Sequence, residues 1–213
     1  MVRARAMLAA AAVAALVAGC GGDDDVADRD TDCPPVAGAD GQTREFDAPP
    51  PDCLDPGADY EAVVTTNQGE FTIAIDPTTA PVAANNFVFL ARNQYFDGTV
   101  CHRIIPEFVV QCGDPTGTGT GGPGYTIADE PPEPGRYRLG SVAMAKTPDP
   151  DSAGSQFFIV IGAQGEALPP EYALFGQVVD GFDTTVSRMA AAGTPTGEPT
   201  GTIAIEQIRV EQQ

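Results

Sequence analysis

Few side chains in this sequence could do chemistry, because the chain has a single histidine, His102, and a single lysine, Lys146. Any mechanism that needs a cluster of either residue is therefore excluded. One histidine also provides no ligand set for zinc, so we expect His102 to be a hydrogen-bonded structural residue. The most distinctive remaining group is Arg103, which shares a short stretch of sequence with Phe108 and Gln111.

Two other patterns match chemical motifs only formally. Ser155 lies between a glycine and a glutamine, so it lacks the second glycine of a nucleophile elbow, and no free histidine could act as its base. Residues 117–122 fit G-x-G-x-x-G, but a proline follows where a helix should begin, and no lysine occupies the P-loop position. We interpret this run as a flexible loop beside a cleft.

Five segments occur in a fixed order along the chain. The longest, residues 101–114, is C-H-R-I-I-P-E-F-V-V-Q-C-G-D. The shorter ones are N-N-F at 85–87, V-A-M-A at 142–145, G-S-Q-F-F-I at 154–159 and L-F-G-Q-V at 174–178. Together they resemble the cyclophilin family, whose corresponding segments are F-H-R-I-I-P-G-F-M-x-Q-G-G-D, E-N-F, S-M-A, G-S-Q-F-F-I and V-F-G-x-V. The resemblance covers roughly residues 60–210.

The resemblance implies a fold and a set of site residues. The implied fold is mainly β, an eight-stranded antiparallel closed β-barrel capped by two α-helices. Arg103 is implied as the catalytic residue. Val109 replaces the family's usual methionine, Lys146 its asparagine and Tyr172 its histidine. The residues implied to bind the peptide substrate are Phe108, Val109, Phe158, Leu168 and Tyr172 around the proline, and Gln111, Ala145, Lys146 and Gln156 along the backbone.

One arginine beside phenylalanines suffices for the implied chemistry. Rotation about an X–Pro bond has a barrier of about 18–20 kcal/mol because amide resonance must be broken. No bond is made, so no nucleophile, metal or cofactor is required. In the twisted amide the nitrogen gains a lone pair, to which a fixed guanidinium donates a hydrogen bond that the flat amide accepts poorly. Since no catalytic group titrates, we expect a rate that is nearly flat between about pH 6 and 9.

The elements that must position these residues are mostly strands. Residues 61–66 and 71–75 are β-branched runs on either side of Asn67-Gln68-Gly69, which predicts a hairpin. Pro81 opens a predicted helix that ends near Arg92, with Ala83, Phe87 and Leu90 on its apolar face. A second short helix is predicted near residues 182–191. Further strands are predicted around residues 100–105, 108–111, 140–144, 156–161, 173–179 and 202–210.

The N-terminal region is predicted to lie outside the fold. Arg3 and Arg5 precede an apolar run at residues 7–18 that is too short to span a bilayer comfortably, and small residues then lead to Cys20. This pattern is typical of a lipoprotein signal peptide at 1–19, with Cys20 acylated and the protein anchored to the outer face of a bacterial cell membrane. Residues 20–58 are rich in aspartate and proline and predict an extended tether, leaving 59–213 as the folded domain.

The cysteines fit an exported protein. Lipidation of Cys20 leaves four of the five cysteines, Cys33, Cys53, Cys101 and Cys112, and disulfides persist outside the cytoplasm. A bond from Cys33 to Cys53 would close a loop in the tether. A bond from Cys101 to Cys112 would need a bulge if Arg103 and Gln111 both face the cleft, because side chains alternate along strands. We leave that second pairing open.

Charge and resemblance together define the expected function. The formal net charge of −19 argues against nucleic acid or an anionic lipid surface as a partner. We expect a monomeric peptidyl-prolyl cis-trans isomerase that acts on proline-containing, partly folded exported chains and contacts the membrane through its lipid alone. The alternative is a cyclophilin-like module or chaperone that binds proline peptides with little turnover. A solute-binding lipoprotein would need a two-lobed fold and a longer chain.

Overall fold

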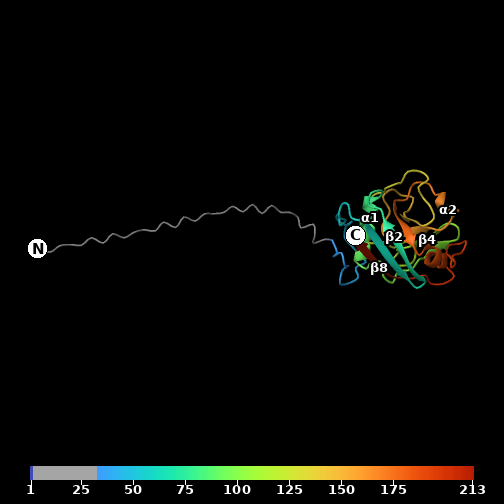
Figure 1. The fold of residues 1–213 in the computed structure, drawn as a ribbon, viewed down its shortest axis with the longest axis horizontal. Coiled ribbons are helices and arrows are strands. Elements are labelled where there is room, and N and C mark those ends of the chain that lie inside the picture. Colours follow the sequence, from blue (N-terminus) through green and yellow to red (C-terminus); the bar gives the residue numbers. More distant parts are fainter. Residues whose placement is uncertain (2–32) are drawn as a thin grey trace.

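Eight antiparallel strands form one curled sheet in the structure, a computed structural model that describes residue 1 and residues 33–213 (Figure 1). The strand order is β3-β4-β6-β5-β7-β2-β1-β8. The two edges of the sheet meet where Val100, just before β3, bridges Ala204, just before β8. The eight-stranded prediction is thus confirmed, although an isolated bridge rather than a continuous ladder joins the edge strands. The strands are β1 (Tyr60–Thr66), β2 (Gly69–Ile75), β3 (Arg103–Ile105), β4 (Val109–Cys112), β5 (Ser141–Met144), β6 (Phe157–Val160), β7 (Leu174–Asp180) and β8 (Ile205–Gln212).

Turn chemistry and side-chain alternation explain the first two strands. Tyr60, Ala62 and Val64 of β1 are buried, and the residues between them are partly exposed, as expected for a strand with one face on a core. The hairpin closes where Thr66 pairs with Gly69, and Gly69 adopts a φ of 125° that favours glycine. The predicted hairpin is confirmed.

In the described part of the chain, three short helical segments accompany one longer helix. Helix α1 (Pro81–Arg92) packs against β7 and β8, with Ala83, Phe87 and Leu90 fully buried as predicted. The helix predicted at 182–191 consists of a π-helix, η1 (Phe182–Val186), followed by α3 (Ser187–Ala190). Helix α2 (Ala163–Glu166) was not predicted, because four residues are too few to show a helical period.

Two apolar clusters lie on opposite faces of β4, β5 and β6. The large one fills the barrel, where the rings of Phe96, Phe157 and Phe175 lie 4.9–5.4 Å from that of Phe87. The small one lies outside the barrel and includes Phe158. Alternate residues of each strand enter the two clusters, which explains why β5 and β6 are buried along their whole length. The buried members of the small cluster are Val109, Tyr137, Ala143, Phe158 and Val160.

Residues 33–58, which we call the strap, lie against the domain. The backbone N–H groups of Ala39 and Thr43 donate to the carbonyls of Arg92 (2.8 Å) and Asn93 (3.0 Å). The side chain of Gln42 donates to the carbonyls of two further residues just beyond α1. The carbonyls of Arg92 and Asn93 lie at the C-terminal end of α1, where no helical N–H group remains to pair with them. The strap therefore caps the C-terminal end of α1.

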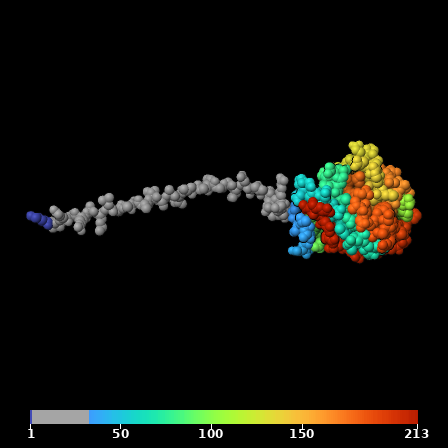
Figure 2. Space-filling model, viewed as in Figure 1, coloured from blue at the N-terminus to red at the C-terminus, as the bar shows by residue number. Residues whose placement is uncertain are grey.

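For residues 33–58, the structure differs from the predicted extended tether. A disulfide joins Cys33 to Cys53, and Figure 2 shows the strap, in blue, beside the red C-terminal strand. Its attachment rests on backbone and side-chain hydrogen bonds and on a few partly buried side chains such as Phe46 and Leu54, which give no hydrophobic period in the sequence. The domain boundary at residue 59 stays a prediction. Residues 2–32, with the predicted signal peptide and the lipidation site Cys20, lie outside the described residues.

Cys101 and Cys112 are also bonded, with both side chains buried in the barrel. The ladder between β3 and β4 pairs Arg103 with Gln111 without a register shift. Just beyond that pair, Gly113 adopts a φ of 88°. Within β4, Gln111 is partly exposed and Cys112 buried, as alternation requires. The departure lies on the other strand, where Cys101 is buried although Arg103, two residues later, is partly exposed. The pairing that the sequence left open is therefore present, and the ladder from Arg103 to Ile105 contains no bulge.

Within residue 1 and residues 33–213, none of the helices has the length and apolar character needed to cross a membrane.

Candidate active site

A hollow of about 150 Å³, which we call the Arg103 hollow, opens on β3, β4 and β6. Nine of the ten site residues expected from the sequence line it, and the tenth, Gln156, lines the hollow next to it. The sequence segments that carry them are far apart, so the fold alone brings them together. The lining residues are Arg103, Phe108, Val109, Gln111, Ala145, Lys146, Phe158, Leu168 and Tyr172.

Arg103 is oriented by an aromatic ring and an amide. The carbon at the centre of its guanidinium lies 5.5 Å from the centroid of the Phe108 ring. Its Nη1 donates to Oε1 of Gln111 at 3.2 Å. Among the described residues Arg103 forms no ion pair with a carboxylate. Since a guanidinium has five N–H donors, this arrangement leaves donors for a bound molecule and does not resemble a surface salt bridge.

A chain of amides fixes the orientation of Gln111. Its Nε2 donates to Oε1 of Gln156 at 2.9 Å, and Nε2 of Gln156 donates to the carbonyl of Gly121 at 3.0 Å. Because the carbonyl of Gly121 can only accept, the direction of each bond in the chain is determined. The oxygen of Gln111 must then point toward Arg103, so the whole chain holds the guanidinium in place.

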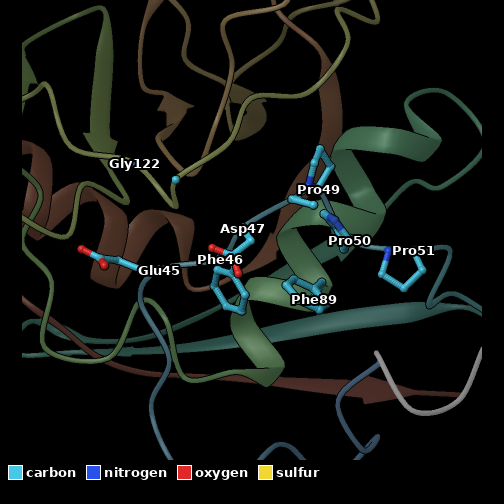
Figure 3. Close-up of a pocket in the computed structure, with 10 residues that line it drawn as sticks. Glu45, Phe46, Asp47, Pro49, Pro50, Pro51, Phe89 and Gly122 are labelled. Carbon is cyan, nitrogen blue, oxygen red and sulfur yellow. The ribbon is translucent and has the colours of Figure 1, made fainter.

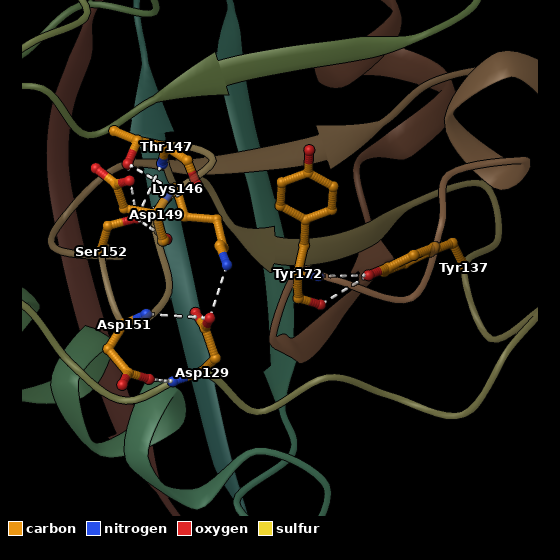
Figure 4. A network of polar contacts seen from close by, with 8 residues as sticks. All are labelled: Asp129, Tyr137, Lys146, Thr147, Asp149, Asp151, Ser152 and Tyr172. Carbon is orange, nitrogen blue, oxygen red and sulfur yellow. Dashed lines mark hydrogen bonds and ion pairs between the residues drawn. The ribbon is translucent and has the colours of Figure 1, made fainter.

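The apolar wall of the Arg103 hollow is held from behind by Tyr137. The rings of Phe158 and Tyr172 meet edge to face, with centroids 5.4 Å apart. The Tyr137 hydroxyl donates to the carbonyl of Tyr172 (2.8 Å) and accepts its N–H (3.0 Å), as Figure 4 shows. Burial raises the pKa of Tyr137 to about 12, so the hydroxyl keeps its proton. Tyr137 was not predicted from the sequence, where its one signal is an aromatic residue within a Pro- and Gly-rich stretch.

The unpredicted helix α2 positions Phe108 and Leu168. A Cβ added at Gly165 of α2 would lie 2.5 Å from the Phe108 carbonyl oxygen, so only glycine allows this approach. The N–H of Ile161 donates to the same carbonyl at 2.9 Å, and the N–H of Leu168 donates to the Gly165 carbonyl at 3.3 Å. Helix α2 therefore links two residues of the hollow that the sequence places 60 positions apart.

Lys146 lies at the far side of the hollow and is paired with a carboxylate. Its Nζ lies 2.6 Å from Oδ2 of Asp129, which also accepts the N–H of Asp151 at 3.1 Å (Figure 4). The hydrogen bond to Asp129 raises the pKa of Lys146, which keeps the ammonium charged. The side chain is thus directed at Asp129, and the main chain of Lys146 remains the part suited to contact a peptide.

A second hollow of about 350 Å³, which we call the loop hollow, adjoins the first and shares Gln111, Ala145 and Lys146 with it. Residues 119–122 of the glycine-rich run form part of its lining. The loop hollow therefore extends the Arg103 hollow into one continuous groove.

The glycine-rich loop is organised around Asp114. This carboxylate is fully buried and accepts the N–H groups of Thr116 (2.7 Å) and Gly121 (3.1 Å), as well as that of Gly119. Burial alone would raise the pKa of Asp114, but these hydrogen bonds lower it overall, so the group is ionised at neutral pH. The predicted position beside the cleft is confirmed. The predicted flexibility stays a prediction, and the hydrogen bonds to Asp114 oppose it.

Ser155 and His102 both lie close to the site without a chemical role. The Ser155 hydroxyl is buried and donates to the Gly113 carbonyl at 2.7 Å, as a structural serine does. Nδ1 of His102 is buried and has no hydrogen-bond partner among the described residues, so the expectation of a hydrogen-bonded histidine is wrong for that atom. Burial lowers the pKa of His102, which is therefore neutral at pH 7. Within residues 33–213, no three metal-ligating side chains gather in one place.

Comparisons with known proteins agree with this geometry. The family model described as "Cyclophilin type peptidyl-prolyl cis-trans isomerase/CLD" matches residues 62–210. The probable peptidyl-prolyl cis-trans isomerase B of Mycobacterium tuberculosis is 39% identical over 165 residues, which are 70% of this chain and 52% of the relative. The peptidyl-prolyl cis-trans isomerase A of the same organism is 36% identical over 173 residues, covering 73% of this chain and 94% of the relative. The chain thus spans about half the length of the first of these relatives.

Solved structures show the same likeness. A crystal structure of a Cryptosporidium parvum cyclophilin type peptidyl-prolyl cis-trans isomerase is 32% identical, with a TM-score of 0.67, and the match covers 73% of this chain and 99% of that one. A second crystal structure of that protein, in the presence of the dipeptide Ala-Pro, is 33% identical with a TM-score of 0.66 over 72% of this chain.

Proposed function

This chain belongs to the cyclophilin-type peptidyl-prolyl cis-trans isomerase family, and we propose on that premise that it catalyses rotation about X–Pro bonds in the Arg103 hollow. One observation carries the proposal. A guanidinium without a carboxylate partner in the described part of the chain is held by Gln111 at the edge of a hollow lined by Phe108, Phe158 and Tyr172.

The substrate enters the hollow by its proline ring. The aromatic walls bury the pyrrolidine and exclude water from the neighbouring amide, which strengthens any hydrogen bond made there. The Cryptosporidium relative was crystallised in the presence of Ala-Pro, which supports a proline-containing peptide as the ligand. The amides of Gln111 and Gln156, together with the main chain at Ala145, are placed to hold the peptide backbone.

Arg103 acts on the amide only when it is twisted. Rotation makes the proline nitrogen pyramidal, and its new lone pair accepts a hydrogen bond from the fixed guanidinium. A preorganised donor of this kind is worth about 2.7–4 kcal/mol, or 10²–10³-fold in rate. Catalysis on a millisecond timescale needs about 5–6 kcal/mol in total. Dry walls and backbone positioning supply the remainder, and no proton is transferred at any step.

The test is an NMR exchange measurement on a blocked Ala-Pro peptide with the wild-type chain and Arg103→Ala. We expect the variant to lose about 10²–10³-fold in catalysed rate, with an unchanged thermal unfolding curve. Arg209→Ala is the matched control, because Arg209 is an exposed arginine that pairs only with Glu211 among the described residues. Equal rates for wild type and Arg103→Ala would instead favour the alternative, a module that binds proline peptides with little turnover.

We propose further that the protein is exported and anchored by lipid at Cys20, where it assists the folding of exported chains as a monomer. The lipoprotein-like sequence before Cys20 supports this, and so do the two disulfides, which persist in oxidising compartments. The net charge of −19 makes nucleic acid an unsuitable partner.

Labelling of cells with a fatty-acid analogue tests the anchor. The wild-type protein should carry the label and sediment with membranes, whereas Cys20→Ala should carry none and remain in the soluble or unprocessed fraction. An unlabelled wild-type protein would refute the anchor and leave the proposed catalysis unaffected. Sedimentation of the purified domain tests the monomer, and a concentration-dependent mass would refute it.

A further inference from the structure

One wall of the loop hollow, at residues 123–125, lies in a turn and not in a strand. Pro123 and Tyr125, which line this hollow together with Gln156, form the wall. A chain seated by its proline in the Arg103 hollow would run along this wall, because the two hollows share three lining residues. The position of the wall therefore decides how well the groove holds residues beyond the proline.

The strap holds this wall in place through Phe46. The backbone N–H of Phe46 donates to the Pro123 carbonyl at 2.9 Å. Its ring lies 5.0 Å from that of Phe89 on α1 and 6.3 Å from that of Tyr125. Figure 3 shows the rings of Phe46 and Phe89 side by side over the helix. Phe46 is thus a wedge between the helix and the wall.

Residues 49–51 of the strap are separated from the wall by a hollow. A hollow of about 960 Å³, the strap hollow, is lined by Glu45, the three prolines at 49–51, Phe89 and the loop glycines Gly122 and Gly124 (Figure 3). This open volume separates the prolines from the loop. The contact between strap and wall is therefore concentrated at Phe46.

Gly124, between the two wall residues, also indicates that the strap lies close to the wall. Gly124 adopts a φ of 98°, and a Cβ there would lie 2.5 Å from the Phe46 carbonyl oxygen. Any other residue at this position would push the strap away. The glycine between the two wall residues is thus suited to the close approach of the strap.

The wall is also connected to the floor of the groove. The Tyr125 hydroxyl donates to Oδ1 of Asn86 at 2.6 Å, and Nδ2 of Asn86 donates to the Gly154 carbonyl at 2.8 Å. The Pro123 ring packs against Gly154, where an added Cβ would lie 3.1 Å from it. A shift of the wall would therefore move Gly154, two residues before Gln156.

We propose that Phe46 is a positioning residue for the loop hollow, so that the strap sets how tightly the enzyme binds polypeptides that extend beyond the X–Pro pair. The proposal rests on the proposed function for its substrate class. Phe46 acts through Pro123 and Tyr125 and does not touch the substrate. Arg103 is held by β3 and by the amide chain that ends at the Gly121 carbonyl, whereas Phe46 bonds to Pro123, so we expect the rotation step itself to change little when Phe46 is lost.

The experiment compares Phe46→Ala with the wild-type chain on two probes, blocked Ala-Pro and a dodecapeptide with the same bond at its centre. Calorimetry measures the Kd of each probe, and NMR exchange measures kcat and KM. We expect Kd and KM for the dodecapeptide to rise about two- to thirtyfold, with kcat unchanged. Blocked Ala-Pro should bind and turn over as with the wild type.

Two further variants guard the interpretation. Gln42→Ala removes strap contacts near α1 and away from the wall, and it should leave both probes unchanged. Phe46→Leu keeps an apolar wedge, so it should fold even if Phe46→Ala does not, and it should fall between Phe46→Ala and the wild type.

An equal loss of affinity for both probes, or no loss for either, would overturn the inference. Failure of the wild-type chain to catalyse exchange would refute the proposed function, and the Kd of the dodecapeptide would still decide the role of Phe46.

Discussion

The two halves of the groove are built in different ways. The Arg103 hollow rests on β3, β4 and β6, whose backbones are fixed by ladder hydrogen bonds and by a small apolar cluster behind them. The loop hollow rests on a glycine-rich loop and a turn, which are fixed by one buried carboxylate, Asp114, and one ring from the strap, Phe46. The Arg103 hollow is therefore held by many weak interactions, and the loop hollow by a few strong ones.

This difference predicts how each half responds to damage. Losing one contact in a ladder leaves its neighbours in place, so the Arg103 hollow should tolerate single changes behind its walls. Losing a carboxylate that several N–H groups share removes several charge-assisted hydrogen bonds at once, which is costly. We therefore expect single substitutions to impair the loop hollow more severely than the Arg103 hollow.

The largest effect is expected for Asp114→Ala. The partly buried hydrogen bonds from the N–H groups of Thr116, Gly119 and Gly121 to a charged acceptor would be lost, at a cost of about 3–5 kcal/mol in unfolding free energy. Chemical denaturation measures this cost. A loss under 1 kcal/mol would mean that the loop does not depend on Asp114.

The same carboxylate gives a pH dependence whose sign is fixed. The pKa of Asp114 is lowered in the folded protein, so its contribution to stability is complete above about pH 4, the ordinary aspartate value. That contribution should be lost as the pH falls through the lower, folded pKa. Denaturation curves of wild type and Asp114→Asn should therefore converge in acid, and a constant difference down to the lowest pH would contradict this assignment.

Removal of the Cys101–Cys112 bond should have the next largest effect, and it acts on the Arg103 side. The bond closes a loop with a sequence separation of 11, so the double variant Cys101→Ala/Cys112→Ala should lose about 3 kcal/mol of stability. Because the ladder still pairs Arg103 with Gln111, the rate on blocked Ala-Pro should stay within about threefold of wild type at a temperature where the variant is folded. A complete loss of rate in the folded variant would show that the bond aligns the site.

A smaller effect is expected for Tyr137→Phe. The hydroxyl holds both backbone groups of Tyr172, and its loss should cost about 1 kcal/mol in binding, or about fivefold in KM for blocked Ala-Pro. The value of kcat should not change, because Arg103 is not touched. Tyr125→Phe is the control, since it removes a hydroxyl from the other half of the groove. A fall in kcat with constant KM would contradict a positioning role.

The smallest effect is expected from pH in the neutral range. Burial lowers the pKa of His102, so this residue stays neutral from about pH 7 upward, and the mechanism has no other group that titrates there. The rate should vary by less than about twofold between pH 7 and 9. A step of tenfold or more would implicate a titrating group and contradict the account.

The sequence predicted the two halves unequally. Residues on β3, β4 and β6 follow a fixed alternation within continuous motifs, so Arg103, Gln111 and Phe158 could be assigned by resemblance and lie together in the structure. Helix α2 and the strap were not predicted because four residues, or a polar segment anchored by a few partly buried side chains, give no hydrophobic period. Tyr137 and Asp129 act from loops, where the partner of a side chain depends on distant segments that sequence spacing does not reveal.

The central claim is that Arg103 stabilises the twisted amide and not the bound peptide. The most direct measurement is kcat, from NMR exchange at saturating blocked Ala-Pro, together with the Kd of that peptide, for wild type and Arg103→Ala. The account predicts a fall of about 10²–10³-fold in kcat with a Kd within about threefold of wild type. A Kd that rises as much as kcat falls, or a kcat that survives the substitution, would contradict it.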